Sequence, residues 1–406
     1  MNSKYDVVIV GGGAAGLATA ASLLKRRRSL DIAVVDPSTT HDYQPGWTMV
    51  GGGVFKQSST RRSMAFLIPS KAKWIPQAVS TFLPDENAVM LDNGEKLNYS
   101  QLIVAAGLKL DFDAIPGLQE TLGKNGVTSN YRYDLAPYTW ELVRQLKQGT
   151  ALFTQPPMPI KCAGAPQKAM YLSADHWLRT GSLSNINIEF CTSTPGLFGV
   201  ADYVPALMEY VEKYGAELNF QHTLVAVDGE NRVATFVDSD GAEVKKQFDL
   251  LHVCPPQSAP DFIASSPLAG EAGWLDVDAH SLQHTQYNNI WGLGDCTNTP
   301  NAKTAAAARA QAPVVAINVL AAMGVGQKRV AYNGYGSCPL TVERGKIVLA
   351  EFGYGGKIIP SLPTSLLNGK RPTRSAWFLK AKALPWIYWN AMLKGREWLI
   401  KTEPQV

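Results

Sequence analysis

The sequence predicts an α/β protein with two Rossmann-like domains and a C-terminal amphipathic helical segment that contacts a membrane. Three features indicate this fold class: a glycine turn between two N-terminal strands, a second run of alternating strands and helices, and an aromatic, basic C-terminus. The 406 residues are 46% hydrophobic and 18% charged. The chain is therefore long enough for two or three domains with cores of their own.

The first feature is a complete βαβ fingerprint. Residues 5–10 form an apolar strand, a strongly helical stretch follows the turn, and the strand at residues 31–36 ends in an acid. The fingerprint residues are Gly11, Gly13, Gly16 and Asp36. The first glycine permits the tight turn, the second lets the backbone approach a pyrophosphate, the third lets helix and strand pack closely, and the acid accepts from a ribose hydroxyl. This pattern favours a domain of the FAD/NAD(P)-binding type over a turn that only tightens packing.

Two later strands decide between FAD and NAD. The strand at residues 97–107 closes on Gly107, and the strand at residues 289–297 ends in Gly-Asp at Asp295. Both resemble the additional FAD motifs of pyridine-nucleotide-disulfide-type flavoproteins, where the last acid binds the ribitol. A strand-end Gly-Asp alone is more often a plain turn. Because it follows the fingerprint and precedes a long helix, Asp295 is the expected flavin ligand.

The long helix, at about residues 304–323, is the next expected contact with the flavin. It is rich in alanine and begins at Thr304, so its N-terminal dipole would face the pyrimidine edge of the ring. Lys303 lies directly before it and adds positive charge that stabilises an anionic reduced flavin; the alternative is a solvated first-turn lysine. We assign Lys303 and Thr304 to the cofactor site.

The middle of the chain predicts a second Rossmann-like domain that lacks a nicotinamide phosphate turn. The turn after its first strand, residues 155–166, contains four prolines and a cysteine. These residues obstruct the backbone approach that a pyrophosphate needs. The expected domains are residues 1–115 and 286–330 for FAD binding, 116–285 for the second domain, and 331–406 for the C-terminal region.

Five cysteines, at positions 162, 191, 254, 296 and 338, show no CxxC or CxxH spacing. No metal site is expected. We interpret Cys191, Cys254 and Cys296 as small buried hydrophobes. Cys162 differs because it stands where the second nucleotide turn belongs, and Cys338 lies beyond the flavin-binding core. This pair suggests a flavoenzyme reduced by a sulfur substrate and not by a nicotinamide.

The charge and the C-terminus bear on partners. A net charge of +4 is too weak to indicate nucleic-acid binding but is compatible with an anionic surface. The first strand leaves no room for a signal peptide, and no segment is apolar for long enough to span a bilayer. Residues 375–400 mix aromatic with basic side chains, and Pro385 is expected to divide them into two short amphipathic helices. We expect peripheral attachment to the cytoplasmic face of a membrane; alternatively, this segment docks on its own core or on a partner in a homo-oligomer.

Seven segments resemble the sulfide:quinone oxidoreductases, in the branch that includes the mitochondrial enzyme. They begin at His41 (HDYQPGWT), Ile160 (IKCAGAPQKAMYLS), Leu251 (LHVCPP), Gly292 (GLGDCTN), Lys303 (KTAAA), Ser337 (SCPL) and Leu349 (LAEF). Together they cover nearly the whole chain. The resemblance implies an enzyme that oxidises hydrogen sulfide, passes two electrons through FAD to ubiquinone or menaquinone, and leaves sulfane sulfur as a persulfide for a small acceptor.

The resemblance also implies roles for individual residues. Cys162 matches the cysteine beside the flavin, and Cys338 matches the cysteine that sulfide attacks and leaves as a persulfide. Lys168 and Lys380 match lysines near the flavin, and Gln44 lies in a matched segment and is assigned to the cofactor. The residues assigned to the quinone side are Phe352, Lys380, Trp386 and Tyr388.

Two absences modify this expectation. Many bacterial members carry a third essential cysteine near residues 127–133, which contain none here, so transfer of sulfur to a small acceptor is favoured over polysulfide growth. No cysteine precedes residue 162, so thioether attachment of the flavin from that part is impossible and FAD should be noncovalent. The remaining alternatives are a type II NADH:quinone oxidoreductase and a non-enzymatic flavin-containing carrier of sulfide or persulfide.

Overall fold

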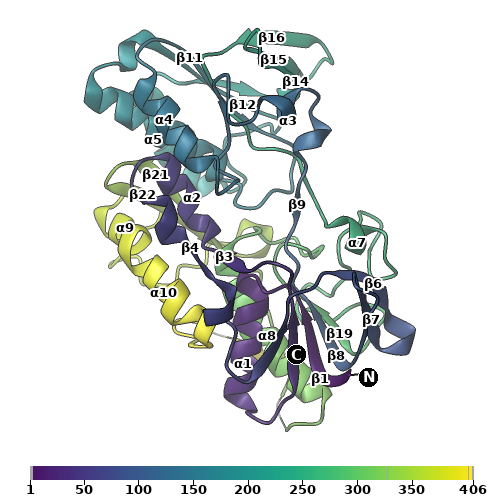
Figure 1. Ribbon diagram of the computed structural model, residues 1–406. Coiled ribbons are helices and arrows are strands. Elements are labelled where there is room, and N and C mark those ends of the chain that lie inside the picture. Colours follow the sequence, from purple (N-terminus) through teal and green to yellow (C-terminus); the bar gives the residue numbers. More distant parts are fainter. Residues whose placement is uncertain (1–2, 327, 401, 405–406) are drawn as a thin grey trace.

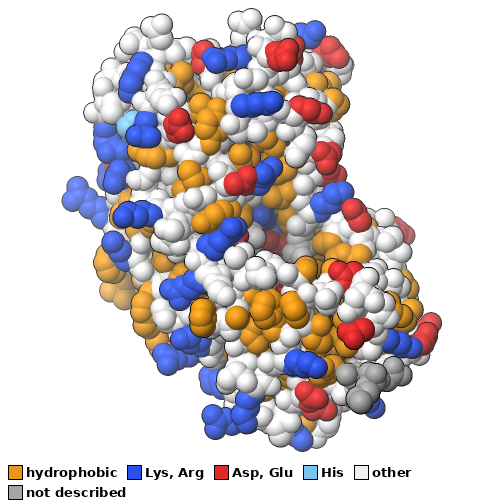
Figure 2. Space-filling model, in the orientation of Figure 1, with side chains coloured by type: hydrophobic (Ala, Val, Ile, Leu, Met, Phe, Trp, Pro, Cys, Tyr) orange, Lys and Arg blue, Asp and Glu red, His pale blue; other side chains and the backbone are white. Residues whose placement is uncertain are grey.

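The structure is a computed structural model that describes residues 3–326, 328–400 and 402–404. Figure 1 shows two lobes. One contains α1 (Ala14–Arg26) and α8 (Ala305–Ala322), and the other contains β11 (Gly149–Gln155) and α5 (Ala165–Thr180). The space-filling view shows that the surface is hollowed between the lobes (Figure 2).

The first lobe is built on a seven-stranded sheet in the order β5-β2-β1-β8-β7-β6, with β19 beside β8. Its strands are β1 Ser3–Val10, β2 Ile32–Val35, β5 Ala72–Ile75, β6 Val79–Leu83, β7 Ala88–Leu91, β8 Lys96–Val104 and β19 Ile290–Gly292. The first strand pairs in parallel with β2 and β8, and its apolar run is buried. Because β19 also pairs in parallel with β8, the chain returns to this sheet after building the second lobe.

Helix α8 lies in the core of the first lobe against α1. Contrary to the expectation from the sequence, it is long and apolar enough to cross a membrane by length and composition, but 61% of it is buried inside the protein. Its polar side chains are used internally: Gln311 Oε1 accepts from the Gly294 amide at 2.8 Å, and Asn318 Nδ2 donates to the Ser281 carbonyl at 3.0 Å. We conclude that α8 is a core helix.

The second lobe contains a parallel five-stranded sheet in the order β10-β17-β11-β12-β13. The strands other than β11 are β10 Val127–Thr128, β12 Ile186–Thr192, β13 Glu217–Phe220 and β17 Leu250–His252. The helices α4 Ala136–Gln145 and α6 Val204–Tyr214 accompany α5, and β14 Thr223–Asp228, β15 Val233–Val237 and β16 Glu243–Gln247 form an antiparallel sheet. The predicted α/β class with two Rossmann-type units is confirmed.

The C-terminal region is divided between the two lobes. The hairpin of β21 (Gly336–Glu343) and β22 (Lys346–Phe352) shares a hydrophobic core with α5 of the second lobe. Beyond it, α9 (Arg374–Phe378), a π-helical turn (Leu379–Ala383) and α10 (Leu384–Asn390) follow one another without a break.

The expectation that Pro385 divides this segment into two helices is wrong. Pro385 lies just after the π-helical turn, and Ala383 and Leu384 before it keep right-handed helical angles, so the proline changes the local helix type without ending the helix. One side of α10 is buried against the first lobe through Tyr388 and Trp389. On this side the segment therefore docks on the protein's own core, which is the alternative to membrane contact given in the sequence analysis.

Short elements complete the chain. They are α2 Trp47–Gly51, α3 Leu118–Thr121, α7 Asp261–Ala264, β3 Thr40–Asp42, β4 Arg61–Ser63, β9 Lys109–Leu110, β18 Gln257–Ser258, β20 Val330–Ala331 and β23 Glu403–Pro404. The β9 and β18 strands pair with each other, and Figure 1 shows β9 in the connection between the lobes.

Candidate active site

Two cysteine sulfurs from distant parts of the chain meet between α5 and the C-terminal hairpin. The Sγ atoms of Cys162 and Cys338 are 3.4 Å apart, and both are free thiols. Cys162 lies in the turn between β11 and α5, with a left-handed φ of 54°, and Cys338 lies on β21. Gly164 makes this approach possible, because a Cβ there would lie 2.7 Å from the Cys338 sulfur. The turn that replaces a nucleotide loop thus presents one thiol to another.

A buried lysine sets the charge of this pair. Lys168, on the first turn of α5, directs its Nζ to the Cys162 sulfur at 3.1 Å. The hydrogen bond from Cys338 and the positive charge of Lys168 outweigh burial and hold the pKa of Cys162 well below its ordinary value. That hydrogen bond and burial raise the pKa of Cys338 well above its ordinary value. The favoured state is a thiolate at Cys162 beside a protonated Cys338.

Two further lysines border the pair. Lys380 is 3% exposed and donates to the Pro45 carbonyl at 2.8 Å. Burial, together with the charge of Lys168, lowers the pKa of Lys380 to about 7. Lys161 donates to Gln44 Oε1 at 2.8 Å, and burial lowers its pKa to about 8. Three lysine amines therefore surround the cysteine turn. The pKa values of two of them, Lys161 and Lys380, lie close to neutral pH.

The N-terminal glycine turn fits the ADP part of FAD. A Cβ at Gly11 would lie 2.5 Å from the Ala105 carbonyl oxygen, and one at Gly16 would lie 1.9 Å from the carbonyl oxygen of residue 11. In contrast, nothing lies within 4 Å of a Cβ at Gly13, so the turn is closed toward the sheet and open where a pyrophosphate would approach. Asp36 Oδ2 accepts from the amide of residue 12 at 2.6 Å, which fixes the acid against this turn.

The cysteine turn also touches the segment predicted to hold the flavin ring. The Cys162 amide donates to the Lys303 carbonyl at 2.8 Å, directly before α8. Thr304 caps α8 by accepting from the Ala307 amide at 3.1 Å. Lys303 Nζ donates to the carbonyls of Asp295 and Thr297 at 2.9 and 2.7 Å, so its ammonium group holds the turn that carries Asp295. It is not the solvated lysine that the sequence left as an alternative.

The remaining predicted residues have different surroundings. Gly107 has a φ of 71° and open space where a Cβ would stand. The residues assigned to the quinone side are not one cluster: Phe352 packs edge-on against Phe198, Trp386 stacks on Trp398, and Tyr388 is buried. Their assignment to a quinone stays a prediction.

One residue near the cofactor turn was missed by sequence reasoning. The imidazole of His41 lies between the carbonyl of Gly12, 3.1 Å from Nδ1, and the hydroxyl of Tyr388, 2.6 Å from Nε2. His41 thereby ties the glycine turn to the C-terminal helix α10. In the sequence, His41 is marked only as the first residue of a segment that resembles the family. That resemblance does not identify the partner of its side chain.

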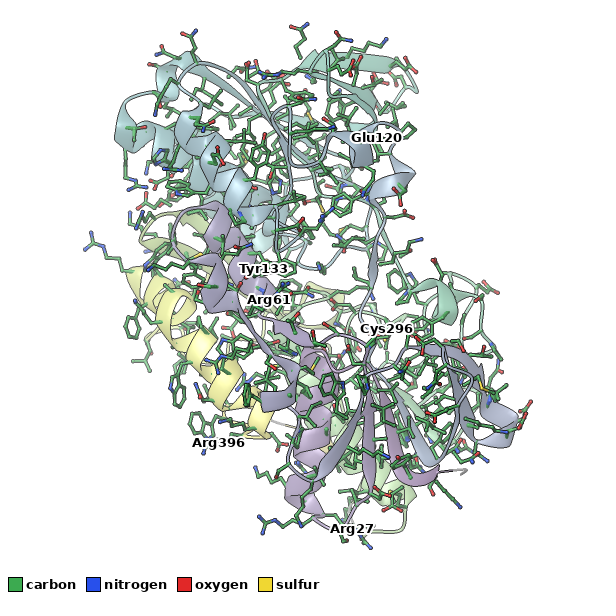
Figure 3. The ribbon with its side chains drawn as sticks, viewed as in Figure 1. Arg27, Arg61, Glu120, Tyr133, Cys296 and Arg396 are labelled. Carbon is green, nitrogen blue, oxygen red and sulfur yellow. The ribbon has the colours of Figure 1, made fainter. Side chains whose placement is uncertain are left out.

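The other three cysteines are buried, as predicted. Burial raises the pKa of Cys191 and of Cys254 to about 12 and that of Cys296 to about 11, so all three stay neutral thiols. Figure 3 places Cys296 inside the first lobe. Within the described ranges, no group of three or more His, Cys, Asp or Glu side chains is arranged to hold a metal ion.

Comparison with known proteins places the chain in a family. Residues 5–152 match the family model described as pyridine nucleotide-disulphide oxidoreductase. The chain is 39% identical to the mitochondrial sulfide:quinone oxidoreductase of Mus musculus, over 97% of this chain and 87% of that protein. It is 40% identical to the mitochondrial sulfide:quinone oxidoreductase of Dictyostelium discoideum, over 98% and 87%. The X-ray structure of the sulfide:quinone oxidoreductase of Aquifex aeolicus has the same fold, with a TM-score of 0.79, 20% identity, and coverage of 96% and 92%.

Proposed function

The chain belongs to the sulfide:quinone oxidoreductases, a group of flavin-dependent oxidoreductases, and we propose that it oxidises hydrogen sulfide at Cys162 and Cys338. Noncovalent FAD, held by the residues named below, would carry two electrons to a membrane quinone, ubiquinone or menaquinone. Sulfane sulfur stays on Cys338 as a persulfide until a small acceptor removes it. The observation that carries this proposal is the 3.4 Å approach of the two sulfurs, with Lys168 3.1 Å from Cys162.

The unequal pKa values of Cys162 and Cys338 determine which of the two sulfurs hydrosulfide attacks. In the oxidised enzyme the two sulfurs would be joined as a disulfide, which requires them to close to about 2 Å. Hydrosulfide attacks the Cys338 sulfur, a new S–S bond forms, the Cys162–Cys338 bond breaks, and Cys162 leaves with the electron pair. A thiol of low pKa is the better leaving group, so the lowered pKa of Cys162 directs attack to Cys338. Covalent capture suits a small anion that offers little surface for binding.

Protein groups around the pair support each part of this reaction. Lys168 neutralises the thiolate that leaves, and its own pKa is raised: burial lowers it, but the negative charge of Cys162 outweighs burial. Bound FAD would accept two electrons from the Cys162 thiolate as that sulfur forms a bond to the outer sulfur on Cys338 and the persulfide proton is released, and FAD would pass these electrons to the quinone. The residues that would hold it are the fingerprint turn, Asp36, Gln44, Gly107, Asp295, Lys303 and Thr304.

The segment at residues 127–133 supports release of sulfur after each turnover. Tyr131 stands in this cysteine-free segment, is buried, and donates its hydroxyl to the Lys161 carbonyl at 3.2 Å. A tyrosine there offers no sulfur on which a longer chain grows. The persulfide therefore passes to a soluble nucleophile.

The outer side of the C-terminal segment supports the proposed membrane seating. Phe378 is 65% exposed and Trp386 51% exposed, whereas Tyr388 and Trp389 face the core. Exposed aromatic and basic side chains beside a docked face are the features of a helix that lies in the membrane interface. We place the enzyme as a peripheral protein on the cytoplasmic face, where a lipid-soluble quinone reaches it.

One pair of mixing experiments tests this function. Sulfide should bleach the visible absorbance of the bound flavin under anaerobic conditions, and NADH should not. Bleaching by NADH alone would identify a type II NADH:quinone oxidoreductase instead. Steady consumption of quinone in the presence of sulfide separates an enzyme from a carrier, which would stop after one equivalent.

A further inference from the structure

Three long stretches of the chain contain no acidic residue, at residues 43–84, 296–342 and 352–396, and the first and third are the richest in basic side chains. Residues 43–84 carry five Lys or Arg side chains, and residues 352–396 carry eight. Because the whole chain has a net charge of +4, these 87 residues hold a charge of +13 and the other 319 residues a net charge of −9. These two segments, which are far apart in sequence, thus carry +13, against +4 for residues 296–342.

These two acid-free stretches lie side by side in the fold. The guanidinium of Arg62 stacks on the ring of Trp389, with its carbon 4.3 Å from the ring centroid. Lys380 reaches across to the carbonyl of Pro45 at 2.8 Å. Figure 2 shows Lys, Arg and apolar side chains together along the edge of the molecule that α9 and α10 occupy. The two stretches thus meet beside α9 and α10, where basic and apolar side chains lie together.

Most of the charges of these two stretches are free to act on a partner. Lys56, Arg62, Lys382 and Lys394 are exposed. Among the side chains that the structure describes in these two stretches, Arg61 and Lys370 form salt bridges, with Asp42 and Asp202, and Arg61 also stacks on Tyr133 (Figure 3). Lys380 is buried. The other Lys and Arg side chains of these two stretches are also exposed, and neither stretch contains an acidic residue that could pair with them.

Phe66 is the most exposed large apolar side chain in the described structure, at 89%. Its neighbours Met64 and Leu67 are buried in the core of the first lobe, so the turn directs Phe66 outward. The described exposed apolar side chains at or within three residues of the two stretches are Phe66, Leu366, Phe378, Trp386, Trp398 and Leu399; Met158 and Leu178 lie elsewhere. An exposed phenylalanine among basic residues is costly in water and favourable in a lipid interface.

We propose that residues 43–84 and 352–396 form a single docking face for an anionic bilayer surface, and that Phe66 is a membrane anchor contributed by the N-terminal half. This inference rests on the proposed membrane seating of the C-terminal segment and adds to it a second anchor and a preference for anionic lipid. The basic face is attracted to negative headgroups while the rest of the protein is repelled, which fixes the orientation of the molecule on the membrane. Phe66 then inserts beside α10.

Flotation of the FAD-bound protein with lipid vesicles tests the proposal. Phosphatidylcholine vesicles are compared with vesicles that also contain phosphatidylglycerol, at low and high salt. Wild-type protein should bind the anionic vesicles more tightly, and salt should weaken this binding. Phe66→Ser should lower the affinity about tenfold, the loss expected for one buried aromatic side chain. Leu178→Ser, which removes an exposed apolar side chain from the second lobe, should leave binding unchanged.

The outcomes separate this inference from the proposed function. Sulfide-dependent reduction of a water-soluble quinone should be the same in wild type and Phe66→Ser, because Phe66 lies outside the cysteine site. Equal vesicle binding by Phe66→Ser and wild type, or equal binding to neutral and anionic vesicles, would overturn the inference while leaving the enzyme assignment intact. Loss of sulfide oxidation in the wild type would overturn the proposed function, whatever the vesicles show.

Discussion

The ammonium nitrogen of Lys168 lies 3.1 Å from the sulfur of Cys162, and both groups are held by the same turn and first helical turn of α5. This contact makes the two cysteines chemically unequal. Cys162 is stabilised as a thiolate, and Cys338 keeps its proton. A symmetric pair would leave the point of sulfide attack undecided, whereas the unequal pair favours the proposed attack at Cys338.

Serine substitutions test the two thiols. Cys162→Ser and Cys338→Ser should each abolish reduction of the flavin by sulfide, because neither variant can form the disulfide that sulfide opens. Both should retain FAD, since the cofactor residues are unchanged, and the flavin spectrum measures this directly. Cys191→Ala, at a buried thiol in the second lobe, is the control and should keep its activity. Normal turnover by both serine variants would remove the cysteines from the mechanism.

Removing the charge of Lys168 should raise the pKa of Cys162. In the reduced enzyme, alkylation of Cys162 should persist well below the ordinary pKa of a thiol because the thiolate is present there. In Lys168→Met the alkylation profile should move to higher pH, and sulfide-driven reduction near neutral pH should slow by about tenfold or more, the effect of one pKa unit. Lys168→Arg should recover part of both. An unchanged alkylation profile would show that Lys168 does not control the thiolate.

Lys380 should give the reaction a dependence on pH near neutrality. Burial and the charge of Lys168 lower its pKa to about 7, so its proton is lost as the pH rises through that value. The protonated form supports the Cys162 thiolate, and this support is present below pH 7 and absent above it. The rate of flavin reduction by sulfide, expressed per hydrosulfide ion because the substrate itself ionises near neutral pH, should show a step near pH 7 that Lys380→Met lacks. Lys382→Met, which changes an exposed neighbouring lysine, should keep the step. If the step disappears in Lys382→Met as well, it belongs to another group than Lys380.

The hydrogen bond between His41 and Tyr388 should contribute to stability. Tyr388→Phe removes the hydroxyl 2.6 Å from a buried imidazole nitrogen. The unpaired nitrogen should lower the free energy of unfolding by about 1–3 kcal/mol, measured by denaturant titration. Tyr99→Phe is the matched control, because the buried Tyr99 hydroxyl has no partner among the described residues. Unchanged stability together with an altered KM for quinone would instead assign Tyr388 to the quinone site.

The proposed membrane contact of the C-terminal segment is best tested by substituting its exposed side chains. Deletion of residues 375–406 would also remove the buried Trp389 and the ion pair that Glu397 forms with Arg26 at 2.7 Å, and would expose α1. Phe378→Ser and Trp398→Ser change only exposed side chains. The double variant should leave the membrane fraction while it still reduces a water-soluble quinone with sulfide. A double variant that stays bound to membranes would contradict the role of this segment.

Local patterns predicted most of the fold. The strand at β1, the glycine turn and the strand that ends at Asp36 were recognisable because each is a contiguous, periodic stretch with its own turn chemistry. The long helix α8 was placed within one residue at each end. Its burial was not predictable from composition, because a core helix and a membrane-spanning helix have the same apolar content.

The site could be predicted only in part, because its contacts are not local. The resemblance paired Cys162 with Cys338, but the spacing of 176 residues carries no geometric signal. Nothing in the sequence showed that Gly164 must lack a side chain for the sulfurs to approach. The sequence also gave no partner for His41, since Tyr388 is 347 residues away. Such contacts depend on how the two lobes and the C-terminal segment pack.

The central claim is tested most directly by titrating the purified enzyme with sulfide in the absence of oxygen. The flavin spectrum is followed, and the peptides that contain Cys162 and Cys338 are then weighed by mass spectrometry. The account predicts two-electron reduction of the flavin by one equivalent of sulfide, with one extra sulfur atom on Cys338 that is joined in turn to Cys162, so that the two peptides are linked through three sulfur atoms. Reduction of the flavin with no added sulfur on either peptide, or with the added sulfur only on Cys162, would contradict it.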